Sequence, residues 1–318
     1  MTPESAADLL RAGLERRAEL LDGLVDTDCV RLLHGISEGW PGTAVDRYGP
    51  VLLVQTWREP LEPGVLEALA AVVPWSLQPV WNHRKGGGST EDIPSEAFGV
   101  ERGIRFDVRP RHRGKDPLLF LDFRAARTWV RNQDCRSVLN LFSYTCGIGV
   151  AAAVGGAERV LNVDFASSAL AVGDTNAALN NVKTQQFEED VFPAMRQLAG
   201  LPLGGRRGRR PSYKHMKPES FDVVVLDPPR WAKTPWGAVD VVRDYASLFK
   251  PALLAVADGG SILATNHVAA VPLEDWQDQL RRCAKKAGRP IEIEMLPVEE
   301  DFPSFDGQPP LKMAICRV

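Results

Sequence analysis

The stretch of sequence that decides the fold is Asn140-Leu141-Phe142-Ser143-Tyr144-Thr145-Cys146-Gly147-Ile148-Gly149. Residues 138–142 form an apolar run that predicts a buried strand, and the small residues after it predict a turn into a helix. Gly147 and Gly149 would let the backbone approach a ligand closely. This order is typical of nucleotide-binding α/β domains, although Gly-x-Gly alone fits a dinucleotide equally well and also fits an ordinary turn.

The same alternation of strand and helix continues after residue 137. The expected strands are 138–142, 159–164, 184–187, 221–227, 261–265 and 291–296, and 311–318 adds a last strand that can run antiparallel. The helical patterns between them are 148–154, 166–179, 190–199, 238–257 and 273–286. Regular alternation predicts a parallel sheet covered by helices on both faces. We therefore expect an α/β fold with a doubly wound, mostly parallel, seven-stranded sheet.

The first part of the chain predicts a smaller N-terminal α+β domain. Apolar residues recur at helical spacing over 4–22. They are followed by β-type runs at 30–33, 43–46, 51–57 and 79–83, by a helical segment at 64–73 and by a hairpin over 97–108. The expected domains are 1–110, for RNA or substrate binding, and 111–318, for the cofactor.

Composition narrows the class of protein. A chain of 318 residues is long enough for two domains with their own cores. Its net charge of -3 means that any nucleic acid must be met by local basic clusters. The five cysteines never form Cys-x-x-Cys, which argues against a zinc site and a disulfide framework and indicates a reducing, cytoplasmic location. The same cysteine spacing predicts no metal. No apolar run approaches the ~20 residues of a membrane span, so we expect no membrane partner.

Three further strand ends carry side chains suited to a cofactor. Asp164 ends the strand 159–164 with a carboxylate that could accept hydrogen bonds from ribose hydroxyls. Asp190, with Phe192 close behind, follows the next strand and suits an adenine ring. For both acids, capping of the following helix is the alternative. Asp227-Pro228-Pro229 ends a buried strand as a rigid turn. In doubly wound sheets, ligands bind at the carboxyl ends of strands, where all these features fall.

The order and spacing of these features resemble class I S-adenosylmethionine (SAM)-dependent methyltransferases over residues 117–318. More narrowly, the sequence resembles the bacterial 23S rRNA methyltransferases that make 5-methylcytosine or 7-methylguanine. Supporting stretches are Phe120-Leu121-Asp122-Phe123-Arg124, Asp301-Phe302-Pro303, Leu311-Lys312 and, similar to the family's middle domain, 39–49. The N-terminal PUA-type RNA-binding domain of many members has no counterpart in this sequence.

The resemblance implies roles by position. Ser143, Tyr144 and Thr145 would line the methionine end of SAM, with Asp164 on the ribose and Asp190 near the adenine. Asp122 and Arg124 would complete the cofactor pocket, and the turn 227–229 would face the target base. The full cofactor set is Asp122, Arg124, Asn140, Ser143, Tyr144, Thr145, Gly147, Gly149, Asp164, Asp190 and Asp227, and the catalytic candidates are Asp227, Pro228, Pro229 and Asn266.

The residues after the fifth expected strand bear on which atom is methylated. Methylation of cytosine C5 needs a cysteine thiolate that adds to the neighbouring ring carbon. Members that do this carry a Ser-Cys-Ser type motif here, whereas this chain has Ala264-Thr265-Asn266-His267. Members that methylate guanine N7 carry asparagine in this region. We therefore favour a nitrogen of a base, with guanine first, although Asn266 could simply end a strand.

Basic and aromatic residues indicate RNA as the partner, with 23S rRNA expected. Trp231 could stack on a flipped base and Arg230 could hold a phosphate. The insertion 206–217, with Arg206, Arg207, Arg209 and Arg210, and a second cluster, with Arg102, Arg105, Arg109, Arg111, Arg113 and Lys115, suit phosphates. A solvated loop is the alternative for the insertion, and packing is the alternative for Trp231.

Other functions stay open at this point. A small-molecule methyltransferase on the same fold would suit the net acidity and the missing PUA-type domain. A cytosine-C5 rRNA methyltransferase would need a thiol such as Cys146 at the site. A non-catalytic RNA-binding factor with a vestigial pocket, and more distantly a nicotinamide dehydrogenase, are further alternatives. Either a monomer or a homodimer is compatible with the sequence.

Overall fold

The described chain divides into two compact units. The computed structural model describes residues 1–203 and 211–318. Unit 1 comprises Met1–Arg124 and Glu299–Gln308, and unit 2 comprises Ala125–Val298 and Pro309–Val318. The division thus falls at Arg124, whereas the expected domain boundary was at 110, because residues beyond 110 pack with the N-terminal elements. For example, the Tyr48 hydroxyl donates a hydrogen bond to the Leu119 carbonyl at 2.8 Å.

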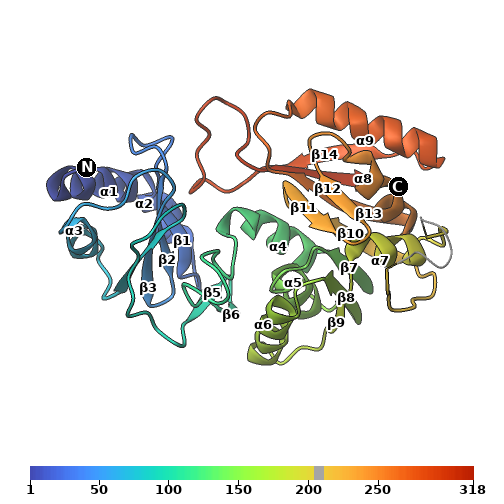
Figure 1. Ribbon diagram of the computed structural model, residues 1–318, viewed down its shortest axis with the longest axis horizontal. Helices are drawn as coiled ribbons and strands as arrows, with labels where there is room; N and C mark the ends of the chain where they lie inside the picture. The colour runs from blue at the N-terminus through green and yellow to red at the C-terminus, as the bar shows by residue number, and fades with distance from the viewer. Residues whose placement is uncertain (204–210) are drawn as a thin grey trace. The chain divides into compact units, whose positions relative to one another are not determined.

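Unit 1 is built on a four-stranded sheet in the order β1-β2-β3-β4 (Figure 1). Its strands are β1 (Cys29–His34), β2 (Thr43–Tyr48), β3 (Val51–Thr56) and β4 (Gln78–His83), and its helices are α1 (Pro3–Arg16), α2 (Ala18–Gly23) and α3 (Val65–Val72). Apolar side chains of α1 and α3, among them Leu10 and Leu69, form one core with the sheet residues Leu32, Val45 and Val54. The helix expected over 4–22 is interrupted at Arg17, whose guanidinium turns inward to Glu38 at 2.6 Å.

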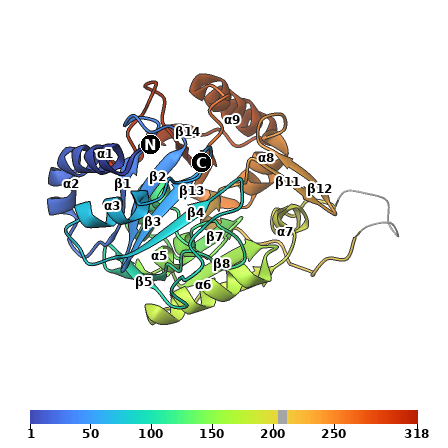
Figure 2. The ribbon, with the colours of Figure 1, turned by 60° about the vertical axis from the view of Figure 1, so that its left-hand side comes forward.

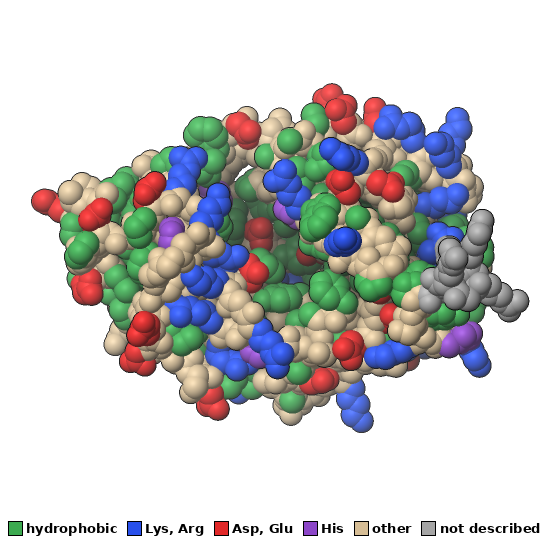
Figure 3. All heavy atoms as spheres, in the orientation of Figure 1, with side chains coloured by type: hydrophobic (Ala, Val, Ile, Leu, Met, Phe, Trp, Pro, Cys, Tyr) green, Lys and Arg blue, Asp and Glu red, His purple; other side chains and the backbone are tan. Residues whose placement is uncertain are grey.

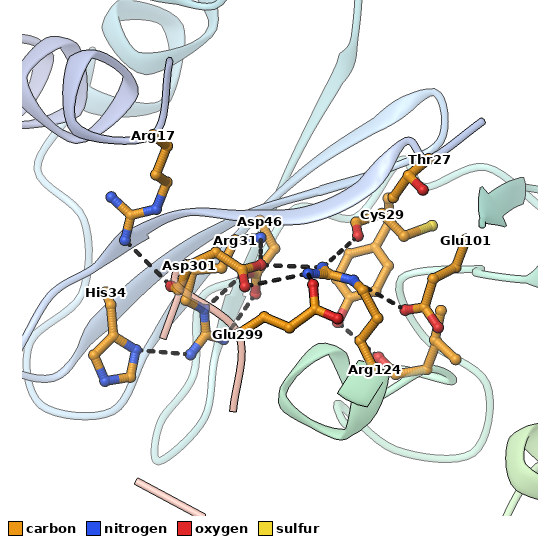
Figure 4. Close-up of polar contacts among 12 residues, drawn as sticks. Arg17, Thr27, Cys29, Arg31, His34, Asp46, Glu101, Arg124, Glu299 and Asp301 are labelled. Atoms are coloured by element: carbon orange, nitrogen blue, oxygen red, sulfur yellow. Dashed lines mark hydrogen bonds and ion pairs between the residues drawn. The ribbon is translucent and has the colours of Figure 1, made fainter. Parts of the chain in front are cut away.

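The C-terminal segment of unit 1 is held to it by a buried cluster of ion pairs (Figure 4). The Arg124 guanidinium is fully buried and contacts Asp301 at 3.0 Å, Glu299 at 3.0 Å and Glu101 at 3.4 Å. Asp301 also accepts a hydrogen bond from the Arg31 backbone N–H at 3.0 Å. The hairpin expected over 97–108 is present as β5 (Phe98–Glu101) and β6 (Ile104–Asp107), and the turn η1 (Leu121–Phe123) precedes Arg124.

Unit 2 is the expected doubly wound sheet, in the order β14-β15-β13-β10-β7-β8-β9. The strands are β7 (Ser137–Leu141), β8 (Arg159–Asp164), β9 (Gln185–Glu188), β10 (Phe221–Leu226), β13 (Val256–Asn266), β14 (Glu292–Leu296) and β15 (Lys312–Arg317). The neighbours from β9 to β13 pair in parallel, and β15 is antiparallel to both β13 and β14. The strand order reverses between β7 and β10, which is where ligands bind in such sheets.

Helices cover both faces of this sheet, as expected (Figure 1). They are α4 (Arg124–Arg131), α5 (Gly147–Val154), α6 (Ser167–Leu179), α7 (Val191–Leu198), α8 (Ala246–Leu254) and α9 (Leu273–Ala287). Helices α7, α8 and α9 share one core with the sheet, through residues such as Met195, Phe249 and Trp276. In the described residues, no helix is long and apolar enough to cross a membrane.

The prediction of a helix over 238–257 is wrong for its first half. Residues Trp231–Thr234 and Gly237–Asp240 instead form an antiparallel hairpin, β11–β12, and helix α8 begins only at Ala246. Val239 and Val241 are buried against the sheet core. Val239 lies in β12 and Val241 just after it, and their spacing of two residues is that of a strand. In so short a segment, the sequence pattern of a strand cannot be told from that of one helical turn.

Candidate active site

The turn after β7 is held in an uncommon backbone conformation. Phe142, Tyr144 and Cys146 adopt positive φ angles of 58°, 48° and 61°. Left-handed conformations of residues other than glycine are costly and gather at functional sites. The turn is fixed by backbone hydrogen bonds from Ser143 N–H to the Val163 carbonyl (3.1 Å) and from Cys146 N–H to the Ser143 carbonyl (2.8 Å). The turn after β7 therefore lies directly against the end of β8.

Asp164 ties this turn to the start of α6. One of its carboxylate oxygens accepts a hydrogen bond from the Tyr144 N–H and the other from the Ala166 N–H, both at 2.9 Å. Burial raises the pKa of Asp164, and the backbone N–H groups that it accepts from lower it in part. A carboxylate has about four lone-pair directions, so it can accept from a ligand hydroxyl beside these backbone donors.

The layer beneath the turn explains two of the small residues. A Cβ on Gly149 would lie 2.2 Å from Asn162 Oδ1, so only glycine fits between α5 and β8. Asn140, buried at the end of β7, donates its side-chain amide to the same oxygen at 2.9 Å. The Asn140 amide thus orders the sheet below the turn, and the cofactor contact expected for it stays a prediction. Gly147 starts α5.

Asp190 lies at the end of β9 and caps helix α7. Its Oδ1 accepts a hydrogen bond from the Phe192 N–H at 3.0 Å. Its Oδ2 is buried and has no hydrogen-bond partner among the described residues. A buried carboxylate oxygen without a donor is costly, so this atom is suited to a ligand that donates. The capping role and the ligand role are therefore compatible in one side chain.

Asp227 follows β10 and is oriented by the end of β13. The Thr265 hydroxyl donates a hydrogen bond to Asp227 Oδ1. The backbone of Thr265 is itself held by the buried Tyr245 hydroxyl, which donates to the Thr265 carbonyl at 2.8 Å. Pro228 is buried and Pro229 partly so, which gives the turn a rigid base. Sequence reasoning missed Thr265 and Tyr245, because nothing in the sequence states that the ends of β10 and β13 are adjacent.

Asn266 ends β13 beside this turn and is only 1% exposed. Its Oδ1 accepts a hydrogen bond from the Val268 N–H at 2.9 Å, whereas its Nδ2 has no partner among the described residues. Its side-chain oxygen therefore shapes the turn that follows the strand. Its catalytic role stays a prediction.

All five cysteines lie in the described residues and are unpaired. Cys146 is fully buried, and a Cβ on Gly173 of helix α6 would lie 2.4 Å from its sulfur, so the thiol fills the space beneath the turn. Burial raises the pKa of Cys146 to about 12. A thiol in this state is not a nucleophile near neutral pH. In the described residues, no His, Cys, Asp and Glu side chains group as metal ligands do.

The remaining expected site residues are placed as follows. Arg230 and Trp231 are exposed at the start of the β11–β12 hairpin, and Trp231 is 61% exposed. Asp122 and Arg124 belong to unit 1, where carboxylates surround the Arg124 guanidinium, so the cofactor contacts expected for both stay predictions. Arg206, Arg207, Arg209 and Arg210 lie outside the described residues.

The fold is that of doubly wound α/β proteins, a class in which ligands bind where the strand order reverses. The family model for S-adenosylmethionine-dependent methyltransferases matches residues 30–317. The chain therefore belongs to that family: it is a SAM-dependent methyltransferase, and SAM is its cofactor.

Relatives and solved structures agree with this assignment. A ribosomal RNA large subunit methyltransferase from Deinococcus radiodurans is 31% identical over 303 residues, covering 88% of this chain and 70% of that protein. Ribosomal RNA large subunit methyltransferase I from Shigella flexneri is 29% identical over 322 residues, covering 93% and 76%. The fold is similar to that of a SAM-dependent methyltransferase from Streptococcus mutans, with a TM-score of 0.81 and 22% identity, covering 100% of this chain and 82% of that chain.

Proposed function

We propose that this chain methylates a nitrogen of a base, with guanine favoured, in the RNA of the large ribosomal subunit. The observation that carries the choice of nitrogen is the state of the cysteines near the site. Cys146 is buried with its pKa raised to about 12, and Asn266 stands where cytosine-C5 enzymes of this group need a thiol. Transfer to a nitrogen needs no covalent adduct.

The strand ends of unit 2 provide the groups for binding the cofactor. We propose that Asp164 accepts hydrogen bonds from the ribose hydroxyls and that Asp190 Oδ2 accepts one from the adenine amino group. The turn 143–145, whose backbone is fixed by Asp164, would hold the methionine end. When bound, SAM supplies a methyl group activated by a sulfonium. The rest of catalysis is alignment of the acceptor nitrogen with that methyl group.

The turn 227–229 is the proposed site of the target base. Asp227, held by the Thr265 hydroxyl, would accept a hydrogen bond from an N–H group on the edge of the base. Such a bond fixes the plane of the ring and so the direction of the acceptor nitrogen. Trp231, exposed beside the turn, would stack on a base taken out of the RNA strand.

Basic side chains of unit 1 support RNA as the substrate. Lys and Arg side chains gather on the face shown in Figure 3, over the part of unit 1 near β5 and β6. In the sequence cluster expected there, Arg109 is paired with Asp107 and Arg102 with Glu299. Lys115 instead donates to the His83 carbonyl at 2.6 Å, and Arg111 to the Trp81 carbonyl at 3.0 Å. Carbonyls leave the positive charge uncompensated, which suits phosphates.

Methyl transfer to deproteinised ribosomal RNA tests the substrate and the atom together. With labelled SAM and nucleoside analysis, we expect a methylated guanine. A 5-methylcytosine product would overturn the nitrogen assignment. If S-adenosylhomocysteine (SAH) binds but no RNA is labelled, the proposed substrate is wrong and the small-molecule alternative gains.

Two variants separate the proposed roles at the site. We expect Asp227→Asn to lower kcat about 100-fold or more, since a positioned carboxylate contributes on that order. Cys146→Ala should keep kcat within about threefold, because no thiolate takes part, and its melting temperature serves as a check on folding. Loss of all methyl transfer in Cys146→Ala with the fold intact would favour the carbon mechanism.

A further inference from the structure

A cavity of about 530 Å³ lies in unit 2 at the carboxyl ends of β8 and β9. Phe165, which follows Asp164, and the acidic residues 188–190 form the part of its wall that belongs to the sheet. The opposite part comes from two segments outside the sheet, 211–214 and 233–236. The second is the turn of the β11–β12 hairpin, which sequence analysis had assigned to no site.

The first of these segments is anchored to the sheet. Lys214 donates its backbone N–H to the Glu189 carboxylate, and its ammonium group donates to the Glu188 carbonyl at 2.6 Å. The Gln197 side chain on α7 donates to the Lys214 carbonyl and accepts from the Met216 N–H, both at 3.1 Å. These bonds fix Tyr213 at the rim of the cavity.

The hairpin rests on that rim through Trp236. The rings of Trp236 and Tyr213 meet edge to face, with their centroids 5.6 Å apart. The backbone N–H of Trp236 donates to Thr234 Oγ1 and the Thr234 hydroxyl donates to the Gly237 carbonyl, both at 3.1 Å, which fixes the turn. On the strand behind the turn, Val239 is buried in the sheet core. Figure 2 shows the hairpin close to helix α7.

Two buried polar atoms belong to residues on this cavity and have no partner among the described residues. They are the indole Nε1 of Trp236, a donor, and Oδ2 of Asp190, an acceptor. A ligand that offers an acceptor and a donor would complement these two atoms, one of each kind. Adenine is such a ligand, since its amino group donates and its ring nitrogens accept.

We propose that Trp236 is a positioning residue for the cofactor, closing the adenine pocket from the hairpin and donating its indole N–H to a ring nitrogen. This inference rests on the cofactor site proposed above. It also links binding of the cofactor to binding of the target base. Strand β11 begins at Trp231 and ends at Thr234, where the Trp236 turn starts. At 3.3 Å per residue, the two ends of the strand are about 10 Å apart. A bound cofactor therefore orders the hairpin that presents Trp231 to the target base.

Calorimetric titration with SAH tests the contact. We expect Trp236→Ala to raise the Kd about 10-fold or more, because both the hydrogen bond and the apolar contact of the indole ring are lost. Trp236→Phe keeps a ring and should raise the Kd about three- to tenfold. Val242→Ala, an exposed residue just beyond the hairpin, is the matched control and should leave the Kd within twofold.

Hydrogen exchange supplies a second measurement that does not depend on activity. In the wild type, SAH should slow exchange of the amides 231–240, and in Trp236→Phe this protection should fall. Wild-type Kd and protection in both Trp236 variants would overturn the inference while leaving the cofactor site intact. If the wild type bound no SAH, the proposed cofactor site itself would be wrong.

Discussion

At the scale of single residues, the site depends on close packing, in which a single added or missing carbon atom matters. Gly149 is the sharpest case, because its Cβ position is 2.2 Å from Asn162 Oδ1. Alanine normally favours a helix over glycine by about 1 kcal/mol. We expect Gly149→Ala to destabilise instead, by about 1–3 kcal/mol, since the helix or Asn162 must move.

Gly23 in α2 is the matched control for Gly149→Ala. Nothing lies within 4 Å of its Cβ position, so Gly23→Ala should be neutral or stabilise by up to about 1 kcal/mol. Urea unfolding of the two variants measures the difference. A stabilised Gly149→Ala would show that the layer between α5 and β8 can yield without cost.

Asp164 should make both the stability of the free protein and its affinity for SAH depend on pH, in opposite directions. Burial raises its pKa, so in the free protein the ionised form is disfavoured, and the stability that this group contributes is lost as pH rises through the raised pKa. Cofactor binding has the opposite sign, because the ribose hydroxyls need the ionised carboxylate. We expect SAH affinity to fall on acidification at a higher pH than an ordinary aspartate, near 4, would give. Titration across pH 4–7 should show this fall, and Asp164→Asn should bind weakly with a flatter profile.

At the scale of elements, the parts predictable from sequence are those where local pattern and tertiary packing agree. The strand ending at Asp164 is mostly apolar, lies between β7 and β9 and is buried, so its sequence pattern and its burial coincide. The carboxyl-end rule then correctly placed Asp164, Asp190 and Asp227 at strand ends of one sheet.

The β11–β12 hairpin shows why the rest could not be predicted. Its strands have four residues each, and the turn between them is Pro235-Trp236, which is not one of the glycine-containing pairs that mark a tight hairpin in sequence. What holds it is tertiary: Val239 in the core and Trp236 against Tyr213. Both contacts join residues whose proximity no local pattern encodes. Thr265 was missed for the same reason, since its role depends on the neighbouring strand that carries Asp227.

At the scale of the whole molecule, the two units are not consecutive segments of the chain. The chain leaves unit 2 after β14, contributes residues 299–308 to unit 1 and returns to form β15. Two contacts hold this segment. The central carbon of the Arg31 guanidinium lies 4.5 Å from the centroid of the Phe302 ring, and the Ser37 hydroxyl donates to the Pro303 carbonyl at 2.9 Å. The chain therefore crosses between the units three times, and each unit depends on a segment distant in sequence.

Arg124 is the centre of this arrangement, and its removal gives the last prediction. Arg124→Met would leave Asp301 and Glu101 buried beside an apolar side chain. Breaking a buried ion pair on one side costs about 3–5 kcal/mol, because the remaining charges lose their partner in a dry environment. Loss of the Arg124 charge should therefore destabilise unit 1 and release residues 299–308 from it. The unfolding of a two-unit chain need not be two-state, so local probes are needed beside the global transition.

Hydrogen exchange followed by urea unfolding measures the effect of Arg124→Met unit by unit. We expect the amides of β1 and of residues 299–308 to lose protection first, while β7 and β8 keep theirs. Arg243→Met is the control, because its pair with Asp240 is an exposed contact at 4.0 Å and contributes little. If Arg124→Met were instead as stable as the control, the cluster would be a neutral alternative to apolar packing, as some buried ion pairs are, and the attachment of 299–308 would rest on Phe302 and Ser37.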